Sequence, residues 1–96
     1  MLACSFPNRG PNLSMTYNCA VALSSGIIEL RVVYSQSVWA WLIISAESQT
    51  LDRGVGTSKE AAQLSSQRAF EERLRWAGMN QQAPKRYDWK RAFERD

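Results

Sequence analysis

Residues 27–44 read IIELRVVYSQSVWAWLII, and this stretch decides the fold class. From Ile27 to Tyr34, apolar residues recur at every second position, the period of a half-buried β-strand. The Ser-Gln-Ser at 35–37 has turn composition. The next segment, Val38 to Ala46, is apolar on both faces and predicts a central strand. Strands joined by so short a turn must run antiparallel.

The strand pattern continues on both sides of this hairpin. Residues 17–23 alternate in the same way and are followed by a Ser-Ser-Gly turn. After a turn at 47–49, residues 50–56 form a further strand, in which Gly54 and Gly56 indicate an edge, a bulge or a close helix approach. The sequence therefore predicts an antiparallel β-meander of three to four strands.

A helix is expected to follow the sheet. Thr57 and Glu60 have the spacing of a capping box, with Thr57 as the N-cap residue. The helix should run to about Ala77 and end at Gly78, a favourable C-terminal cap. At helical spacing, one narrow face contains Ala61, Ala62, Ser65, Ala69 and Trp76. This face is flanked on one side by Phe70, Leu74 and Ala77. We expect this face on the sheet, with Trp76 filling the far end and Leu64 exposed on the opposite side.

The chain divides into three parts on this interpretation. Residues 1–16 form an irregular arm, interrupted by two prolines, with Met15 as an alternative start. Residues 17–78 form the domain, and residues 79–96 form a linker and a basic aromatic tail. The tail is expected to form a short helix that places Trp89 and Phe93 one turn apart. The predicted class is α+β: a meander of three to four strands packed by one amphipathic helix, with a short C-terminal helical tail.

The composition argues against most enzyme classes. The 96 residues contain no histidine, the commonest general base and metal ligand. Two cysteines without histidine do not make a four-ligand zinc site, and no phosphate-binding or dinucleotide motif is present. Glu47 and Asp52 flank one turn, and we interpret them as solvated charges rather than an acid–base pair. We expect no catalytic residue, no metal and no cofactor.

The sequence also carries no targeting segment. It has no run of ~18 apolar residues and no charged start followed by an apolar core, so we expect neither a membrane span nor a signal peptide, and a cytoplasmic location. In a reducing compartment Cys4 and Cys19 are expected as free thiols rather than as a disulfide.

The charge is concentrated in the C-terminal part. Residues 1–58 contain three basic and three acidic side chains, whereas residues 59–96 contain nine and six, which accounts for the net +3. This asymmetry indicates an anionic partner for the tail.

Two aromatic sets are candidate contact residues. Trp39 and Trp41 share one face of the central strand, and this face either packs under the helix or forms an exposed aromatic platform. Trp89 and Phe93 lie among basic residues of the tail. They either fix the C-terminus to the core while the charges stay in water, or form a recognition surface. The interpretation as core is favoured for the first pair, and the interpretation as a staple for the second.

Residues 54–62, GVGTSKEAA, together with Ala69 and Leu74, resemble the last strand and second helix of a double-stranded RNA-binding domain. That resemblance implies three antiparallel strands before the helix and contacts from the helix start to phosphates. Only Lys59 stands where that family has several lysines, and a strand-like segment replaces its first helix. On this alternative the nucleic acid would be bound by Lys59, Lys85, Arg86, Lys90, Arg91 and Arg95.

The favoured hypothesis is a non-enzymatic binding protein that occupies a surface of a larger macromolecule. In size and style the chain looks like small inhibitor proteins of phages and mobile elements, including anti-CRISPR proteins. A protein partner is favoured over nucleic acid, and homodimerisation through an edge strand or Leu64 is an open alternative. The expected contact residues are Trp39, Trp41, Arg53, Arg86, Trp89, Lys90 and Arg91.

Overall fold

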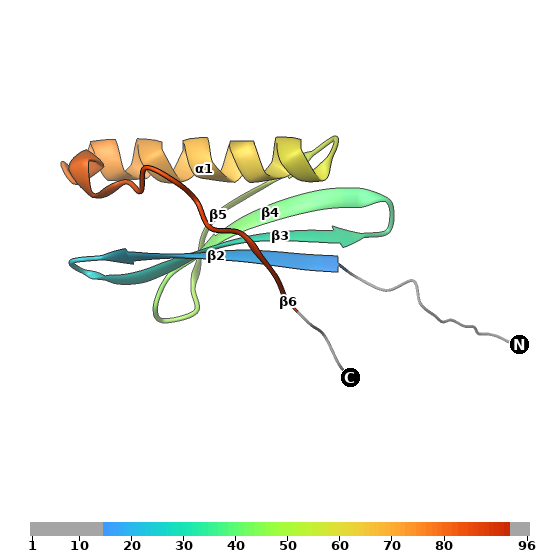
Figure 1. Ribbon diagram of the computed structural model, residues 1–96, viewed down its shortest axis with the longest axis horizontal. Helices are drawn as coiled ribbons and strands as arrows, with labels where there is room; N and C mark the ends of the chain where they lie inside the picture. The colour runs from blue at the N-terminus through green and yellow to red at the C-terminus, as the bar shows by residue number, and fades with distance from the viewer. Residues whose placement is uncertain (1–14, 93–96) are drawn as a thin grey trace, which may run out of the picture.

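The computed structural model describes residues 15–92, which form an antiparallel sheet and one long helix (Figure 1). The elements in chain order are β2 (Met15–Leu23), β3 (Gly26–Ser35), β4 (Val38–Ile44), β5 (Thr50–Gly56), α1 (Lys59–Trp76), the 3₁₀ helix η2 (Asn80–Gln82) and β6 (Lys90–Ala92). The predicted α+β class and meander are confirmed. The four predicted strands lie where the alternation placed them, and β2 takes in the last two residues assigned to the irregular arm.

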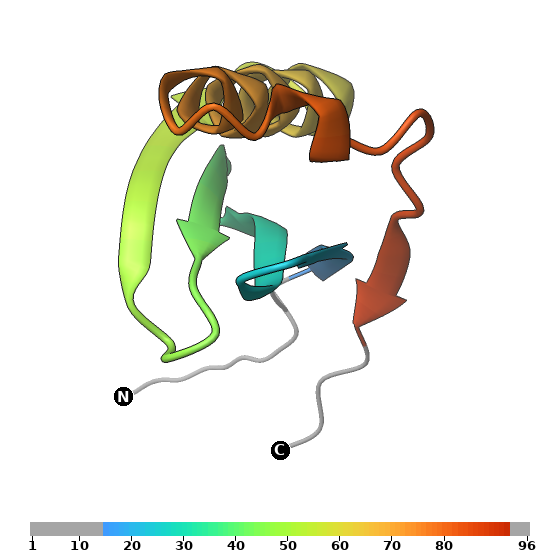
Figure 2. The ribbon, with the colours of Figure 1, turned by 90° about the vertical axis from the view of Figure 1, so that its left-hand side faces the viewer.

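The five strands have the order β5-β4-β3-β2-β6, and every neighbouring pair is antiparallel. The first four strands are therefore sequential, and only β6 returns from the far end of the chain. The sheet curls strongly, and α1 lies along its concave side (Figure 2). β5 and β6 form the two margins, with β3 at the centre.

The β3–β4 hairpin has a two-residue loop. Gln36 and Ser37 both have positive φ, at 56° and 66°, which is the backbone signature of a type I′ turn. This turn has the twist that an antiparallel hairpin requires, although neither residue is a glycine. It sets the register in which Tyr34 pairs with Trp39 and Val32 with Trp41.

The core lies between the concave face of the sheet and α1. Leu30, Val32 and Ile43 are fully buried there, and Trp41 is 8% exposed. The Trp41 ring lies over Gly54 on the neighbouring strand, where a Cβ atom would be 2.6 Å from the ring. A Cβ on Gly56 would be 2.8 Å from the backbone nitrogen of Ala62. Both glycines of β5 thus allow close packing on an edge strand, as their positions in the sequence suggested.

The helix begins one residue later than the capping-box prediction. Ser58, not Thr57, is the N-cap, and its hydroxyl accepts a hydrogen bond from the Ala61 amide at 3.0 Å. At the other end Gly78 has φ of 74°, and the Met79 amide donates to the Leu74 carbonyl at 2.7 Å. This is a Schellman termination, so the prediction that Gly78 ends the helix is confirmed.

The buried stripe of α1 differs from the predicted face. It consists of Ala62, Ser66, Phe70 and Leu74, which follow one another at intervals of four residues. Trp76 does not fill the far end of the core, because its side chain is 83% exposed. The prediction for Trp76 was therefore wrong, whereas the predicted exposure of Leu64 is confirmed at 46%.

The C-terminal tail forms a strand rather than the predicted helix. β6 pairs with the outer edge of β2 (Figure 1), and the register places Arg91 opposite Tyr17. On the way, the Gln82 side chain exchanges two hydrogen bonds with Ser24, at 2.8 and 3.2 Å. The Tyr87 hydroxyl donates to the Glu71 carboxylate at 2.6 Å, and Trp89 packs against the core. Phe93, the second aromatic residue of the predicted tail helix, lies outside the described residues.

Candidate partner-binding surfaces

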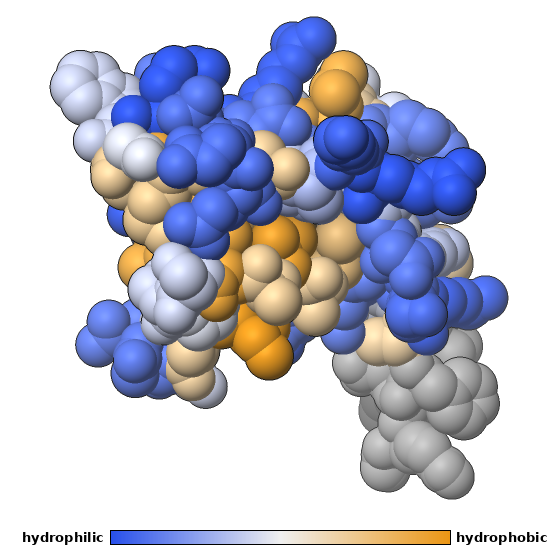
Figure 3. All heavy atoms as spheres, turned by 60° about the vertical axis from the view of Figure 1, so that its left-hand side comes forward, coloured by the Kyte–Doolittle hydropathy of each residue, from blue (hydrophilic) through white to orange (hydrophobic). Residues whose placement is uncertain are grey.

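An apolar groove opens between the C-terminal half of α1, the β2–β3 hairpin and the start of β5. Figure 3 shows apolar side chains gathered at the centre of this face, surrounded by hydrophilic ones. The groove measures about 500 Å³, and pockets that bind ligands typically measure about 300–1,000 Å³. Apolar side chains from each element line it, among them Leu23, Ile28, Leu51, Phe70, Leu74 and Met79.

The packing of α1 explains why the groove lies at this end of the molecule. The small residues Ala62 and Ser66 let the start of the helix approach the sheet closely. One and two turns later the larger Phe70 and Leu74 occupy the same stripe, and larger side chains need more room between a helix and the strands that it covers. The interface therefore widens towards the end of the helix, and the widening leaves apolar surface open to solvent.

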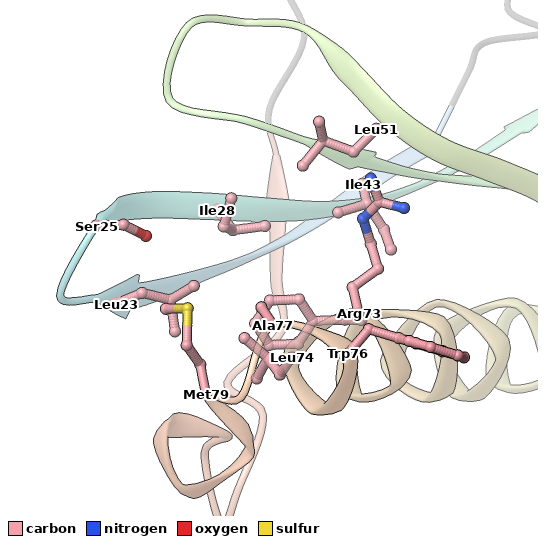
Figure 4. Close-up of a pocket in the computed structure, with 11 residues that line it drawn as sticks. Leu23, Ser25, Ile28, Ile43, Leu51, Arg73, Leu74, Trp76, Ala77 and Met79 are labelled. Carbon is pink, nitrogen blue, oxygen red and sulfur yellow. The ribbon is translucent and has the colours of Figure 1, made fainter.

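Two long side chains of the last helical turns form the rim of the groove. Arg73 extends from α1 towards Leu51 and is the one charged residue among those that line the groove (Figure 4). Trp76 also lines it, pointing away from Leu23 and Met79. Tryptophan and arginine are the residues most enriched at the energetic centres of protein interfaces. An apolar floor with this rim can bury the side chain of a partner and hold a nearby carboxylate.

A second surface, the aromatic–basic cluster, lies at the opposite end of α1. It consists of Tyr17, Tyr34, Trp39, Lys59 and Arg91. The ring of Trp39 lies 4.6 Å from that of Tyr34 and 6.3 Å from that of Tyr17, measured between centroids. The Lys59 ammonium lies 4.8 Å above the Tyr17 ring, and the strand register places Arg91 opposite Tyr17. All three rings are partly exposed, so the cluster presents aromatic surface beside two cations.

The structure separates the two tryptophans that the sequence paired. Both lie on the helix-covered face, so the favoured prediction of a core face is confirmed. Trp41 is buried over Gly54 and offers no contact surface, which rules out the platform that both tryptophans would have formed. Trp39 is half-buried at the end of the sheet and belongs to the aromatic–basic cluster.

The predicted basic residues are scattered rather than gathered. Lys85 and Arg86 are exposed on the segment before β6, and Lys90 lies 3.3 Å from the Asp88 carboxylate. Arg53 is exposed on the convex face of β5, at the margin of the sheet opposite β6. Of these residues, Lys59 lies over the Tyr17 ring, and the strand register places Arg91 opposite Tyr17. Arg95 lies outside the described residues.

The convex face of the sheet is a third exposed surface. Ile27, Val38 and Val55 are 57%, 44% and 69% exposed on it. At its centre the Arg31 guanidinium donates to the Glu29 carboxylate at 2.9 Å, beside a hollow lined by Leu42 and Ile44. Single exposed aliphatic residues of this kind are ordinary on protein surfaces, so they carry little information about a partner.

The nucleophilic and titratable side chains inside the fold are shielded. Cys19 is a free, buried thiol, and burial raises its pKa, which lowers its reactivity; Cys4 lies outside the described residues. Burial, and then the hydrogen bond to Glu71, raises the pKa of the Tyr87 hydroxyl. Within residues 15–92 no group of three or more acidic or cysteine side chains could hold a metal ion. The helices of that range include none that is long and apolar enough to span a membrane.

Sequence reasoning missed Arg73, Trp76, Tyr17 and Tyr34 as candidate contact residues. Trp76 was assigned to the core because it lies near the angular position of the small residues of α1. The buried positions lie four residues apart from Ala62 to Leu74, so they shift around the helix and away from the angular position of Trp76. This shift could have revealed the exposure of Trp76. The tyrosines lie on alternating strands and give no sign of their exposure until the sheet ends are known.

Comparison with protein-family models, with curated proteins and with solved structures found no match for this chain.

Proposed function

We propose that this protein is a non-enzymatic binding protein whose apolar groove docks onto a protein partner. The observation that carries the proposal is the combination of an open apolar groove with Arg73 and the 83% exposed Trp76 at its rim. A tryptophan so exposed contributes nothing to the core, whereas burial at an interface would remove about 150–250 Å² of its surface from water. Such residues dominate the binding energy of many interfaces.

The small size of the chain fits action by occupation of a surface. A domain of this kind can block a site on a larger protein without any chemistry of its own. This is how we interpret its likeness in size and style to phage and mobile-element inhibitors such as anti-CRISPR proteins. The tail residues proposed as additional contacts, Arg86 and Lys90, are both exposed, and Lys90 lies 3.3 Å from the Asp88 carboxylate.

Panning of a random peptide library against the intact protein tests this function. We expect enriched peptides to bind the wild-type protein and to lose about tenfold or more in affinity to Trp76→Ala, which corresponds to about 1.4 kcal/mol. Leu64→Ala is the matched control, because Leu64 is an exposed apolar residue of the same helix outside the groove. Failure to enrich any peptide, or equal binding to both variants, would contradict the proposal.

The aromatic–basic cluster favours nucleic-acid binding as a second candidate function. Partly exposed rings can stack on unpaired bases, and adjacent cations can neutralise phosphates. Lys59, which also carries the resemblance to a double-stranded RNA-binding domain, lies directly above the Tyr17 ring. This candidate predicts binding that depends on Lys59 and Arg91 rather than on Trp76.

Fluorescence anisotropy with single-stranded and duplex oligonucleotides at 50 and 200 mM salt separates the two functions. A nucleic-acid site with 6–10 phosphate contacts would lose about 10³–10⁵ in affinity over this range. Lys59→Ala should then reduce both the affinity and the salt dependence, with Arg68→Ala as a control for an exposed basic residue of the same helix outside the cluster. Absence of binding at 50 mM salt would remove this candidate.

A further inference from the structure

We propose that the outer edge of β5 and the adjoining groove take an extended segment of a partner protein in which apolar and acidic side chains alternate. The inference rests on the proposed function and adds the mode of binding to it. The segment would add a sixth strand to the five-stranded sheet, with its backbone paired to β5.

β5 is one margin of the sheet, so one side of its backbone is not paired with another described strand (Figure 2). The Arg53 amide donates at 2.8 Å to the carboxylate of its own neighbour, Asp52. An amide bonded to a side chain in this way is not part of the β4–β5 ladder and points outward. By the two-residue period of a strand, the Val55 amide points to the same side. The edge therefore presents the outward amides of Arg53 and Val55. The Arg53 amide already donates to an acidic acceptor, the Asp52 carboxylate.

The register with β4 fixes which side chains would lie beside an added strand. Trp41 pairs with Gly54, so Gly54 faces α1 while Arg53 and Val55 face the convex side. Alternate residues of the added segment would consequently face α1 on one side and lie beside Arg53 on the other. The two sides present different chemistry to the partner.

The side that faces α1 carries Gly54 and, by the same alternation, Asp52, and it leads to the apolar groove at Leu51. Ser65 and Ala69 are small, half-buried residues of the helix, and they follow the spacing that leads to Arg73 and Trp76. The groove begins at the same place, since Leu51 of β5 and Arg73 of α1 both line it. Apolar side chains of the segment would enter beside Trp76, above Leu74 (Figure 4) and the neighbouring groove residue Phe70.

Arg53 selects acidic side chains on the convex side of the segment. Arg53 lies on the convex side of β5, where a directly opposite carboxylate is favourable and a lysine unfavourable. Arg73, the charged member of the groove lining, lies on the α1 side, where the aliphatic part of its side chain can pack beside the apolar side chains of the segment. A segment with glutamate or aspartate on one face and leucine, isoleucine or valine on the other satisfies both sides.

The test uses a capped seven-residue peptide that alternates leucine and glutamate, matched in length to β5. Its binding to the full chain is measured by isothermal titration and by NMR chemical-shift changes. A leucine–lysine peptide of the same length is the charge control. Two further peptides carry backbone N-methyl groups on alternate amides, one in each of the two frames, so that only one of them blocks the donors facing β5.

Three protein variants complete the experiment. Val55→Pro removes an outward donor without breaking the ladder to β4, which is where an edge strand tolerates proline. Arg53→Glu reverses the charge beside the segment, and Leu64→Ala is the control outside the track. A thermal melt of each variant establishes that it is folded, and the N-methylated peptides test the edge independently if Val55→Pro is not.

We expect the leucine–glutamate peptide to bind with shifts along β5. Val55→Pro and one N-methyl frame should weaken it at least tenfold, Arg53→Glu should weaken it several-fold, and Leu64→Ala should leave it unchanged. Tighter binding of the lysine peptide, or equal loss with both N-methyl frames, overturns the proposal. So does a dimer that Val55→Pro dissociates in sedimentation, because a second copy would then occupy the edge. If library-selected peptides bind in a Trp76-dependent way while the alternating peptide does not, strand addition fails and the proposed function stands.

Discussion

Gly54 can pack against the Trp41 ring because its side chain is a single hydrogen atom. The Trp41 ring occupies the position from which a Cβ on this residue would be only 2.6 Å away. We therefore expect Gly54→Ala to displace the ring or the strand and to lower the free energy of unfolding by about 1–3 kcal/mol. Urea denaturation measures the change. Val55→Ala, at an exposed neighbouring position, should stay within about 0.5 kcal/mol, and equal stability of the two variants would contradict the packing described.

Tyr87 connects the C-terminal segment to the helix through its hydrogen bond to Glu71. Tyr87→Phe removes the donor and should lower stability by about 1–2 kcal/mol at neutral pH. Because the folded protein raises the pKa of the hydroxyl above its ordinary value of 10.0, deprotonation is harder in the folded than in the unfolded state. The stability of the wild-type protein should thus be retained below pH 10 and fall as the pH rises beyond it.

The pH dependence of urea denaturation between pH 8 and 11 checks this expectation. The decline above pH 10 should be shallower in Tyr87→Phe than in the wild type. Burial also raises the pKa of the Cys19 thiol, so part of the decline, beginning near pH 9.0, should remain in the variant. Parallel profiles for the two proteins would show that Tyr87 does not titrate in the way described.

At the residue scale, the sequence was most informative where the structural signal is local. Gly78 was identified as the helix end because the left-handed conformation there favours glycine. The N-cap was misplaced by one residue because Thr57 and Ser58 both have a hydroxyl that can accept from the helix start. Which of them does so depends on the angle at which the chain leaves β5, and that angle is a tertiary property.

The C-terminal segment is the element that differs most from expectation. Residues 85–93 have a spacing compatible with a short helix, but a helix of about ten residues gains little stability alone. The outer edge of β2 offers backbone hydrogen bonds that such a helix lacks, and β6 takes them. The competition between local spacing and a distant strand edge cannot be resolved from a window of sequence.

Truncation after Gly78 tests the contribution of this element. The deletion removes the Gln82–Ser24 and Tyr87–Glu71 hydrogen bonds and exposes the core surface that Trp89 covers. We expect a loss of about 3 kcal/mol, from the removal of a partly buried aromatic residue together with the lost hydrogen bonds. A thermal melt measures it. Unchanged stability would support a recognition tail in place of the staple.

On the scale of the whole molecule, the alternating residues of the strands and the turns between them predicted the sheet, because strand period and short connections leave few arrangements open. They did not predict the groove. It arises from the difference between small residues at one end of a helical stripe and large ones at the other, acting on a sheet whose curl is not encoded in any one strand. The same is true of the aromatic–basic cluster, which combines Tyr17, Lys59 and Arg91 from three distant parts of the chain.

The strand order also predicts how stability is distributed across the molecule. β3 lies at the centre of the sheet, is paired on both sides and carries the fully buried Leu30 and Val32. β6 is a margin of three residues, two of them exposed.

In native-state hydrogen exchange, we expect the β3 and β4 amides to exchange most slowly, at rates set by global unfolding, and those of β6 to exchange first. The outward amides of β5 should exchange quickly and become protected when a partner strand binds. Protection of β6 equal to that of β3 would mean that the C-terminal segment unfolds only with the whole domain, which would make it an integral strand of the core rather than a staple applied to a finished sheet.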